Sequence, residues 1–246
     1  MKPFLVLQLR PETEAADDEF AAFLAKGGLR PAEVRRIRLD REDLPAALDL
    51  DALSGVIVGG GPGCVSDPPE GKDPVEARIE AAILSLMPAI VGRDIPFMGC
   101  CYGIGVLAHH LGAPVSRERH GEPVGPSRCR LTAEGAADPL LAGFPPEFDA
   151  FVGHKEAVQA LPAGCAHLVR SDPCPFQMIR HGHNVYATQF HPEADAAGFA
   201  TRIRIYRNRG YFPPESADRL IAICRAADVT WPERILARFV ARYRRD

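Results

Sequence analysis

The sequence of 246 residues has no long apolar run, no large excess of charge of either sign and no recognisable signal peptide. A membrane-spanning helix needs about 20 consecutive apolar residues. The opening stretch, residues 1–10, has neither the length nor the small-residue cleavage site of a secretory leader. The net charge of −3 gives no electrostatic reason to bind nucleic acid or a membrane. We therefore expect a cytoplasmic protein with no nucleic-acid partner and no membrane partner.

Cysteine pairs with the spacing of a metal site or a redox motif are also missing. The cysteines are Cys64, Cys100, Cys101, Cys129, Cys165, Cys174 and Cys224. An odd and scattered set supports neither a disulfide framework nor a zinc site. A reducing compartment fits this set best, and it would leave the thiols free to react. We expect no metal and no cofactor.

Short apolar runs alternate with helical periodicities over the first half of the chain. Such alternation predicts an α/β protein with a mostly parallel, open sheet and helices on both faces. The expected strands are residues 4–8, 34–39, 53–58 and 95–100, and the expected helices are residues 12–26, 74–86 and 102–111.

The chain changes character from Val115 to Tyr186, where apolar runs are shorter and proline and glycine are frequent. This pattern indicates a small mixed or antiparallel section. Its expected strands are residues 128–131, 167–170, 176–180 and 184–190. From Ala197 the chain is mostly helical, with breaks at residues 210–214 and near Pro232. We expect a single domain over residues 1–246, with a core of about residues 1–196 and a helical C-terminal extension of about residues 197–246.

The C-terminal extension is rich in arginine, and two interpretations are open. The arginines alternate with apolar residues at helical spacing, which favours solvated helix faces with Trp231 and Phe239 turned inward. A partner-binding surface is the alternative. The arginines are Arg202, Arg204, Arg207, Arg209, Arg219, Arg225, Arg234, Arg238, Arg242, Arg244 and Arg245.

A candidate nucleophile, Cys101, lies where an expected strand breaks sharply into an expected helix, in the run of residues 96–105. A helix N-terminus lowers the pKa of a thiol and so favours the reactive thiolate. Gly99 and Gly103 flank the thiol, and we expect no room for a Cβ at either position in so tight a turn. Side-chain alternation would turn Cys100 into the core, as an inert residue, and Cys101 outward.

A candidate base follows ninety residues later, in residues 189–193. His191 lies two positions before Glu193, so both side chains can face the same side of an extended segment, and Pro192 fixes the backbone between them. Glu193 would hold the imidazole in the useful tautomer. The histidines without such a partner are predicted to be solvent or packing residues: His109, His110, His181 and His183.

Attack on an amide or acyl carbon also requires hydrogen-bond donors for the developing oxyanion. The backbone N–H of Tyr102, next after the nucleophile, is one candidate, and the glycine loop of residues 59–63 is the other. A glycine loop can also hold phosphate, but this one lacks the Gly-Lys-Ser/Thr ending of a phosphate loop. Beside a cysteine elbow, the oxyanion interpretation is favoured.

These segments together resemble the class I glutamine amidotransferases, the triad family, and within it the GMP-synthase-like stand-alone branch. The family patterns are Gly-x-Cys-x-Gly, met by residues 99–103, Gly-Gly-Pro, met by residues 60–62, and His-Pro-Glu, met by residues 191–193. Weaker similarities lie at residues 122–125 and 154–158. The resemblance covers roughly residues 4–195 and implies a flavodoxin-like fold.

The resemblance implies a role for each matching residue. Cys101 would form a γ-glutamyl thioester, His191 would shuttle protons, and Glu193 would orient the imidazole, so that ammonia or an amine is released from glutamine or a related γ-glutamyl compound. The implied oxyanion donors are Gly60, Gly61 and Tyr102. The implied substrate-binding residues are Gly105, Gly125, His154 and Glu156.

Two departures from the family keep other functions open. Gly105 stands where the family commonly has a glutamine that holds the substrate; a glycine would open space there for a γ-glutamyl compound other than free glutamine. The sequence has no Ser-Gly-Gly-x-Asp-Ser pattern of a synthetase, so acceptor chemistry would need a separate synthetase or acceptor subunit. The alternatives are a γ-glutamyl peptidase or hydrolase that is not coupled to a synthetase, and a catalytically silent regulatory subunit. The possibility of a homo-oligomer is also left open.

Overall fold

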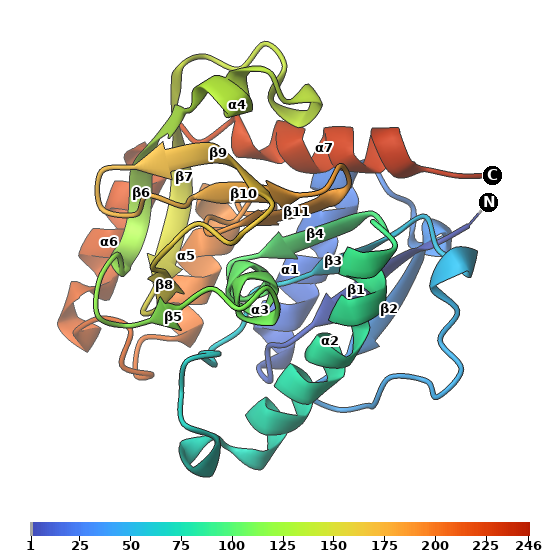
Figure 1. Ribbon diagram of the computed structural model, residues 1–246. Helices are drawn as coiled ribbons and strands as arrows, with labels where there is room; N and C mark the ends of the chain where they lie inside the picture. Colours follow the sequence, from blue (N-terminus) through green and yellow to red (C-terminus); the bar gives the residue numbers. More distant parts are fainter. Residues whose placement is uncertain (1) are drawn as a thin grey trace.

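The fold is built around a sheet of nine strands that carries helices on both faces (Figure 1). The structure, a computed structural model, describes residues 2–246. The strands are β1 (Phe4–Gln8), β2 (Val34–Arg38), β3 (Gly55–Val58), β4 (Phe97–Cys100), β5 (Val115–Ser116), β6 (Glu122–Leu131), β7 (Glu147–His154), β8 (Ala157–Val158), β9 (Cys165–Ser171), β10 (Met178–His181) and β11 (Val185–Thr188). The α-helices are α1 (Thr13–Gly27), α2 (Pro74–Gly92), α3 (Tyr102–His110), α4 (Ala133–Ala136), α5 (Ala196–Ile205), α6 (Ala217–Ala226) and α7 (Pro232–Tyr243).

The sheet has a parallel half and an antiparallel half, in the order β2-β1-β3-β4-β11-β10-β9-β6-β7. The strands from β2 to β11 pair in parallel, and those from β11 to β7 pair antiparallel. A separate two-stranded sheet joins β5 to β8. The predicted α/β architecture, with helices on both faces of a large central sheet, is confirmed. The mixed section continues the same sheet.

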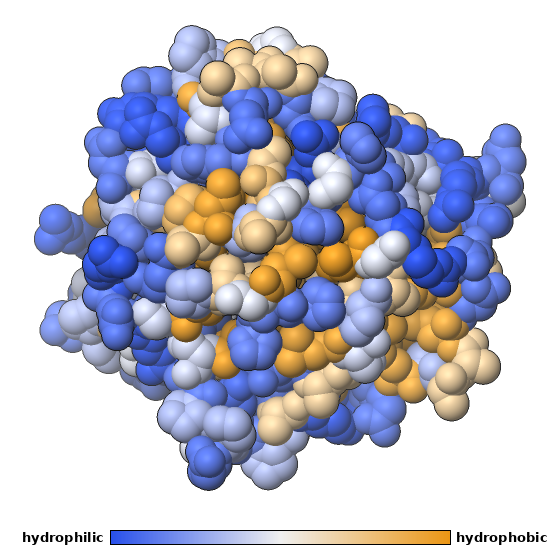
Figure 2. Space-filling model, in the orientation of Figure 1, coloured by the Kyte–Doolittle hydropathy of each residue, from blue (hydrophilic) through white to orange (hydrophobic). Residues whose placement is uncertain are grey.

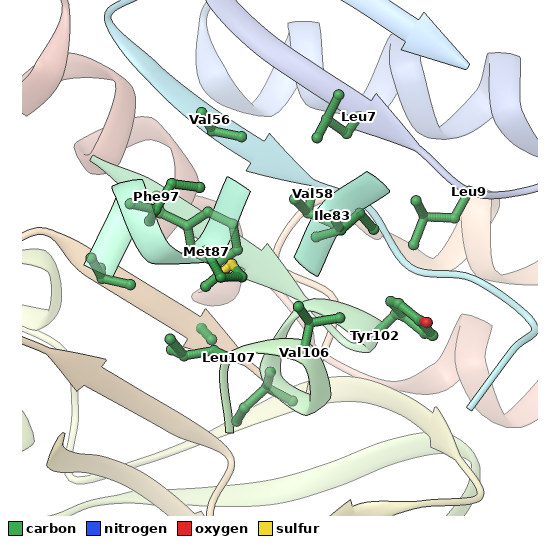
Figure 3. Close-up of a cluster of buried hydrophobic side chains, with 14 of the residues drawn as sticks. Leu7, Leu9, Val56, Val58, Ile83, Met87, Phe97, Tyr102, Val106 and Leu107 are labelled. Carbon is green, nitrogen blue, oxygen red and sulfur yellow. The ribbon is translucent and has the colours of Figure 1, made fainter. Parts of the chain in front are cut away.

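The parallel strands are apolar along their whole length because both of their faces are covered. Along β1, Leu5 and Leu7 belong to one core cluster, while Phe4 and Val6 belong to another. The first cluster packs β1, β3 and β4 against α2 and α3, as Figure 3 shows for Leu7 and side chains of both helices. The second cluster includes buried side chains of α1 and α7. The burial of alternate residues on opposite faces fixes the register of the sheet.

Strand β7 is absent from the sequence-based expectation, and β6 begins earlier than expected. Strand β6 contains Pro123, Gly125 and Pro126 ahead of the expected strand at residues 128–131, and it accommodates them with a register shift between Glu122 and Gly125. In β7, Asp149 and Gly153 interrupt the apolar pattern, yet Phe148, Ala150, Phe151 and Val152 are buried. Burial of these side chains on both faces of the sheet outweighs the interruptions of the apolar pattern. The result is an edge strand, β7, whose end lies beside the candidate site.

Helix α2 extends to Gly92, past the expected end at residue 86, with Pro88 inside it. Proline removes one backbone hydrogen bond and normally ends or kinks a helix. Met87 and Ile90, on either side of Pro88, are fully buried in the first core cluster. Their packing holds this turn in helical form. Figure 2 shows apolar side chains gathered over the middle of the face on which α2 and α3 lie, with hydrophilic ones around them.

The C-terminal extension packs onto the sheet, and one of its arginines contradicts the predicted solvated face. On α7, Phe239 is fully buried, as expected, and Trp231 is partly buried against Phe144 at a ring distance of 5.1 Å. Arg202, on α5, is buried with only 5% of its surface exposed. Helical spacing could not distinguish it from its exposed neighbour Arg204. Within residues 2–246, no helix combines the length and the apolar character needed to cross a bilayer.

Candidate active site

The thiol of Cys101 lies at a strained turn between β4 and α3, at the carboxyl edge of the parallel strands. Cys101 has φ 54° and ψ −89°, in a region that non-glycine residues rarely adopt. Its N–H donates to the carbonyl of Thr188 at 2.7 Å, which ties the turn to the end of β11. Cys100 is fully buried and Cys101 only partly, so the predicted alternation of the two thiols is confirmed.

The two glycines of the elbow have different roles. A Cβ on Gly99 would lie 2.9 Å from the Cα of Gly103, so any side chain at Gly99 would force strand and helix apart. A Cβ on Gly103 would meet nothing closer than Val58, at 3.8 Å. The prediction that both positions lack room for a side chain is therefore wrong for Gly103. Only Gly99, on the strand side of the elbow, must be a glycine for the strand and the helix to approach each other so closely.

The pKa of the Cys101 thiol is raised, whereas the sequence predicted that it would be lowered. Burial raises the pKa of Cys101 to about 12, and the positive charge of Arg10 opposes this shift only in part. The carboxylates of Glu193 and Glu156 add to the rise. The prediction of a thiol made acidic by the helix N-terminus is therefore wrong here. A thiol with so high a pKa is protonated near neutral pH.

His191 and Glu193 form a buried pair after the end of β11. The Nδ1 of His191 lies 2.9 Å from Oε1 of Glu193, and the two side chains are 5% and 0% exposed. The backbone N–H of His191 donates to the carbonyl of Phe151 on β7 at 3.0 Å, and the imidazole packs against the ring of Phe199 at 5.8 Å. The contact that the sequence predicts between imidazole and carboxylate is present. We assign the Nδ1 proton to this contact, which leaves Nε2 free to accept a proton.

Arg202 completes a buried group of three charged or polar side chains. Its Nη2 lies 2.9 Å from Oε1 of Glu193 as an ion pair, although Nη2 is not aligned for a hydrogen bond. Its Nη1 lies 3.2 Å from Nδ1 of His191. Asp195 caps α5 by accepting from the N–H groups of Ala197 and Gly198, and so starts the helix that carries Arg202 back to the pair. Sequence analysis missed this residue.

The charges of this group set the protonation of both partners. Burial alone would raise the pKa of Glu193, but the charges of His191 and Arg202 outweigh burial and hold that pKa well below its usual range. Burial lowers the pKa of His191, and Arg202 adds to the fall, while Glu193 opposes it. The imidazole is therefore neutral, and the carboxylate ionised, near neutral pH. That combination is what a general base and its orienting group require.

Cys101 and His191 border one small cavity of about 50 Å³, here named the inner cavity. Its lining residues are Arg10, Gly61, Cys101, Val124, Gly153, His191, Phe199, Arg202, Ile203, Tyr206, Tyr211 and Phe212. The elements that meet there are the ends of β1, β4 and β7, helix α5 and the loop after it. A thiol and a neutral imidazole thus border the same cavity.

The glycine loop after β3 touches this group closely. A Cβ on Gly60 would lie 2.7 Å from Cε1 of His191 and 2.8 Å from Nη2 of Arg10, so only glycine allows the imidazole and the guanidinium to approach the loop. The backbone N–H groups of Gly60, Gly61 and Tyr102 meet no acceptor among residues 2–246. Unpaired backbone donors beside a nucleophile are what an oxyanion hole requires.

Arg10 is a second buried arginine at the site that sequence analysis missed. Its Nε lies 2.9 Å from Oε1 of Glu19, which is fully buried on α1, and its Nη1 donates to the hydroxyl of Tyr206 at 3.2 Å. Gln8 also donates to Glu19, at 3.0 Å. A signal for Arg10 was present in the sequence, because a charged residue just past the carboxyl end of a parallel strand lies where open α/β sheets bind ligands.

Glu156 anchors the far part of the glycine loop. Its two carboxylate oxygens accept the backbone N–H groups of Val65 and Ser66, each at 2.9 Å. A Cβ on Gly105 would lie 3.1 Å from Oε1 of Glu156. The prediction that Gly105 opens space in the pocket is therefore wrong, because the carboxylate of Glu156 and the side chain of Val65 occupy that space. Gly105 lies behind the site and does not line its cavities.

His154 is held by a buried polar network rather than aimed at a ligand. Its Nε2 lies 3.0 Å from Oε2 of Glu122, and its Nδ1 lies 2.8 Å from the backbone oxygen of Glu156. Cys174 converges on the same two side chains with a spacing that could suit a metal ion. Ser127 already donates to Glu122 at 2.6 Å, so the carboxylate is engaged without a metal. The network positions the turn that carries Glu156. Gly125, on β6, lies away from the described cavities.

Two further cavities adjoin the inner one. A head-group cavity of about 20 Å³ is lined by Gly61, Pro62, Gly63, Cys64, Cys101, Tyr102, Gly153, His154, Lys155, Glu156, Gln189 and Tyr211. An outer cavity of about 650 Å³ lies beyond and shares Gly61 and Tyr211 with both smaller ones. The hydroxyl of Tyr211 donates to the carbonyl of Pro62 at 3.2 Å. The loop between α5 and α6 therefore forms a wall of the site.

Comparisons with known proteins agree with this geometry. The family profile described as glutamine amidotransferase class-I matches residues 22–204. A GMP synthase (glutamine-hydrolysing) of Thermomicrobium roseum is 32% identical over 169 residues, which cover 65% of this chain and 28% of that protein. One subunit of the GMP synthase (glutamine-hydrolysing) of Thermoplasma volcanium is 26% identical over 69% of this chain and 79% of its own length. The crystal structure of a glutamine amidotransferase from Methylobacillus flagellatus has a TM-score of 0.71 and 22% identity, and covers 100% of this chain and 97% of that one.

The fold and the site thus define an α/β protein with a cysteine elbow and a facing histidine at the carboxyl edge of its sheet. The chain belongs to the class I glutamine amidotransferase family. It spans only 21% to 28% of the length of the first curated relatives that it matches. The resemblance stated from its motifs is confirmed.

Proposed function

We propose that this protein hydrolyses the side-chain amide of glutamine or a related γ-glutamyl compound through a γ-glutamyl thioester on Cys101. One observation carries the proposal: Cys101 and His191 border the same cavity, and His191 is bonded at 2.9 Å to a buried carboxylate. A silent regulatory protein has no physical need for a strained thiol beside a neutral imidazole and unpaired backbone donors.

In the first step, Nε2 of His191 takes the thiol proton while Sγ of Cys101 attacks the amide carbon. The raised pKa of Cys101 makes this transfer necessary at the moment of attack. Negative charge develops on the amide oxygen, where the N–H groups of Gly60, Gly61 and Tyr102 would stabilise it. His191 then gives its proton to the leaving nitrogen as the carbon–nitrogen bond breaks, so that ammonia or an amine departs and the thioester remains.

In the second step, His191 takes a proton from water, and the resulting hydroxide attacks the thioester carbon. The carbon–sulfur bond breaks, the proton returns to Sγ, and glutamate departs. Throughout, Glu193 keeps the Nδ1 proton of His191 in place and stabilises the imidazolium that forms twice per cycle. Arg202 keeps Glu193 ionised, because its charge opposes protonation of the buried carboxylate.

The head-group cavity suits the amino-acid end of a glutamyl substrate. Glu156 offers a carboxylate to an ammonium group, and Lys155 offers an ammonium to a carboxylate, on adjacent residues of one turn. The Nζ of Lys155 lies 4.3 Å from the centre of the Tyr211 ring. We propose that these two residues bind the α-amino and α-carboxylate groups. The predicted roles of Gly105 and Gly125 in binding find no support from their positions, and His154 lines the head-group cavity with both ring nitrogens already engaged.

The test is covalent labelling with a glutamine-mimicking affinity label, followed by intact-mass analysis. We expect one adduct on the wild type and none on Cys101→Ser. Hydrolysis of glutamine or of γ-glutamyl amides by Cys101→Ser should fall by at least about 10³-fold. Cys100→Ser is the matched control, because it alters the neighbouring buried thiol. A wild type that takes no label and hydrolyses no γ-glutamyl compound would overturn the proposal.

The partner and setting of the reaction stay proposals. Relatives named as one subunit of a GMP synthase motivate a separate synthetase subunit that consumes the ammonia. An uncoupled γ-glutamyl hydrolase is the second candidate, and the large outer cavity next to the two small cavities favours it, because glutamine alone needs no such room. Co-purification with a synthetase subunit, together with activation by it, would favour the first. We also propose that residues 1–246 act as one domain in the cytoplasm; a homo-oligomer remains a prediction.

A further inference from the structure

Two buried guanidinium groups line the inner cavity beside the thiol and the imidazole. Arg10 and Arg202 are 6% and 5% exposed and come from different elements, the segment just after β1 and helix α5. The proposed hydrolysis of glutamine gives neither of them a ligand, because the amide nitrogen of glutamine carries no further group. A departing ammonia would not need two guanidinium groups in a cavity of about 50 Å³.

Each guanidinium keeps donors that no protein group satisfies. On Arg202, Nε is buried without any acceptor, while Nη2 lies 2.9 Å from Oε1 of Glu193 as an ion pair but is not aligned for a hydrogen bond. Arg10 bonds through Nε to Glu19 and through Nη1 to Tyr206, while its Nη2, near Gly60, meets no acceptor among residues 2–246. A fully buried donor without a partner, such as Nε of Arg202, carries a substantial desolvation cost, whereas Nη2 of Arg10 is not fully buried and is accessible to a ligand. A ligand with acceptor oxygens in the inner cavity would remove that cost.

The inner cavity is the place for the leaving group, not for the glutamyl group. The imidazole that protonates the leaving nitrogen must lie within hydrogen-bond reach of it, and the inner cavity is lined by His191 while the head-group cavity is not. The charged pair that suits an amino-acid head group, Lys155 and Glu156, lies in the head-group cavity instead. An amine leaving from the thioester therefore enters a site with two guanidinium groups.

We infer that the natural substrate is a γ-glutamyl amide whose amine carries an acidic group, and that Arg10 and Arg202 bind this group on the leaving-group side of Cys101. The inference rests on the proposed function and specifies its substrate class. The reaction balances as hydrolysis: water adds, the γ-amide bond breaks, and glutamate and an acidic amine such as an amino acid are released. Planar guanidinium groups match carboxylate oxygens in pairs. The rest of a larger amine has room in the outer cavity, which joins the inner cavity at Gly61, Tyr206 and Tyr211.

The sharpest test uses two substrates of nearly equal size that differ in charge. We compare kcat/KM of the wild type for γ-glutamylglycine and for γ-glutamylglycinamide, with glutamine as a third substrate. We expect γ-glutamylglycine to be favoured by about tenfold or more, as charge-assisted hydrogen bonds imply. Equal values, or a preference for the neutral amide, would overturn the inference and leave the proposed function intact. Failure to hydrolyse all three, together with no labelling of Cys101, would overturn both.

A variant assigns the preference to the arginines. Arg10→Gln alone would leave Glu19 buried without its partner, so the double variant Arg10→Gln with Glu19→Gln is used, which removes both charges of the pair. We expect the preference for γ-glutamylglycine to fall to about twofold or less. Arg128→Gln, an exposed arginine on β6, is the control and should keep the full preference. A double variant that folds and keeps it would exclude Arg10 as the binding group.

Discussion

The two sides of the thiol are built in different ways. On the head-group side, Glu156 holds the chain at Val65 and Ser66 through bonds to backbone N–H groups. On the inner-cavity side, Arg10 and Arg202 form buried ion pairs with Glu19 and Glu193. The first arrangement fixes the position of a loop. The second fixes where protons and charges reside, so the two sides should respond differently to mutation.

The ion pairs on the inner-cavity side are not explained by stability. A buried ion pair contributes little net stability, because desolvation of two charges offsets their attraction. What the pairs do is set the charge state of the catalytic candidates: the pKa of Glu193 is held low, and the pKa of His191 is also lowered. Mutations of the arginines should change the pH dependence set by His191, whereas mutations on the head-group side that keep the charge of Glu156 should change the rate equally at every pH.

Gly60 lies against both His191 and Arg10 on the inner-cavity side, and its substitution should have the largest effect. In Gly60→Ala, the new Cβ would lie 2.7 Å from Cε1 of His191, so the imidazole must move. Displacement of a catalytic group by about 1 Å can reduce the rate by about 100-fold, and we expect kcat to fall by that order. Gly63→Ala is the matched control in the same loop: its Cβ would meet nothing closer than 3.6 Å. Steady-state kinetics of both variants test this, and similar rates for the two would contradict it.

Arg202→Gln should distinguish the inner-cavity side from the head-group side through the pH dependence of kcat/KM. His191 must be neutral to accept a proton, so activity is lost as pH falls through the pKa of His191. Burial lowers that pKa below 6.5 and Arg202 lowers it further, so removal of Arg202 raises it. The acidic limb of the profile of kcat/KM should therefore move to higher pH, so that the loss of activity relative to the wild type grows as the pH falls.

The control for this prediction is Arg204→Gln, an exposed arginine on the same helix. Its acidic limb should coincide with that of the wild type. An unchanged limb in Arg202→Gln, with only a uniform loss of activity, would mean that Arg202 positions the loop or the helix and does not act on the imidazole. Circular dichroism and thermal unfolding of both variants establish that the comparison is made between folded proteins.

Features that depend on neighbours in the sequence could be predicted, whereas features that depend on distant residues could not. The elbow at Cys101 and the contact of His191 with Glu193 depend on neighbours one to two positions away, so local reasoning finds them. Arg202 was assigned to a solvated face, because its burial depends on where α5 docks against the site. The rise in the pKa of Cys101 likewise follows from burial and from carboxylates distant in sequence. Charges brought together by packing leave no periodic signal.

The fold shows the same limit. The parallel strands were predictable because they are buried on both faces and read as continuous apolar runs. Strand β7 was missed because Asp149 and Gly153 interrupt its pattern, and the buried partners that compensate come from β6 and α5. One such partner is Phe199, whose ring stacks on Phe151 at 4.8 Å. Sequence periodicity reports the environment of a segment only where that environment is uniform along it.

The smallest effect is expected at Gly105, and it tests the head-group side alone. In Gly105→Ala, the Cβ would lie 3.1 Å from Oε1 of Glu156, so the carboxylate must shift by a few tenths of an ångström. Because Glu156 holds Val65 and Ser66, we expect kcat/KM for glutamine to fall about two- to threefold, equally at all pH values. Replacement of glycine by alanine within a helix stabilises it by up to about 1 kcal/mol, which offsets part of the strain. Gly92→Ala, at the end of α2 with no atom near its Cβ, measures that helical gain without the contact. A change in pH profile at Gly105→Ala would show that the two sides are coupled through the thiol rather than independent.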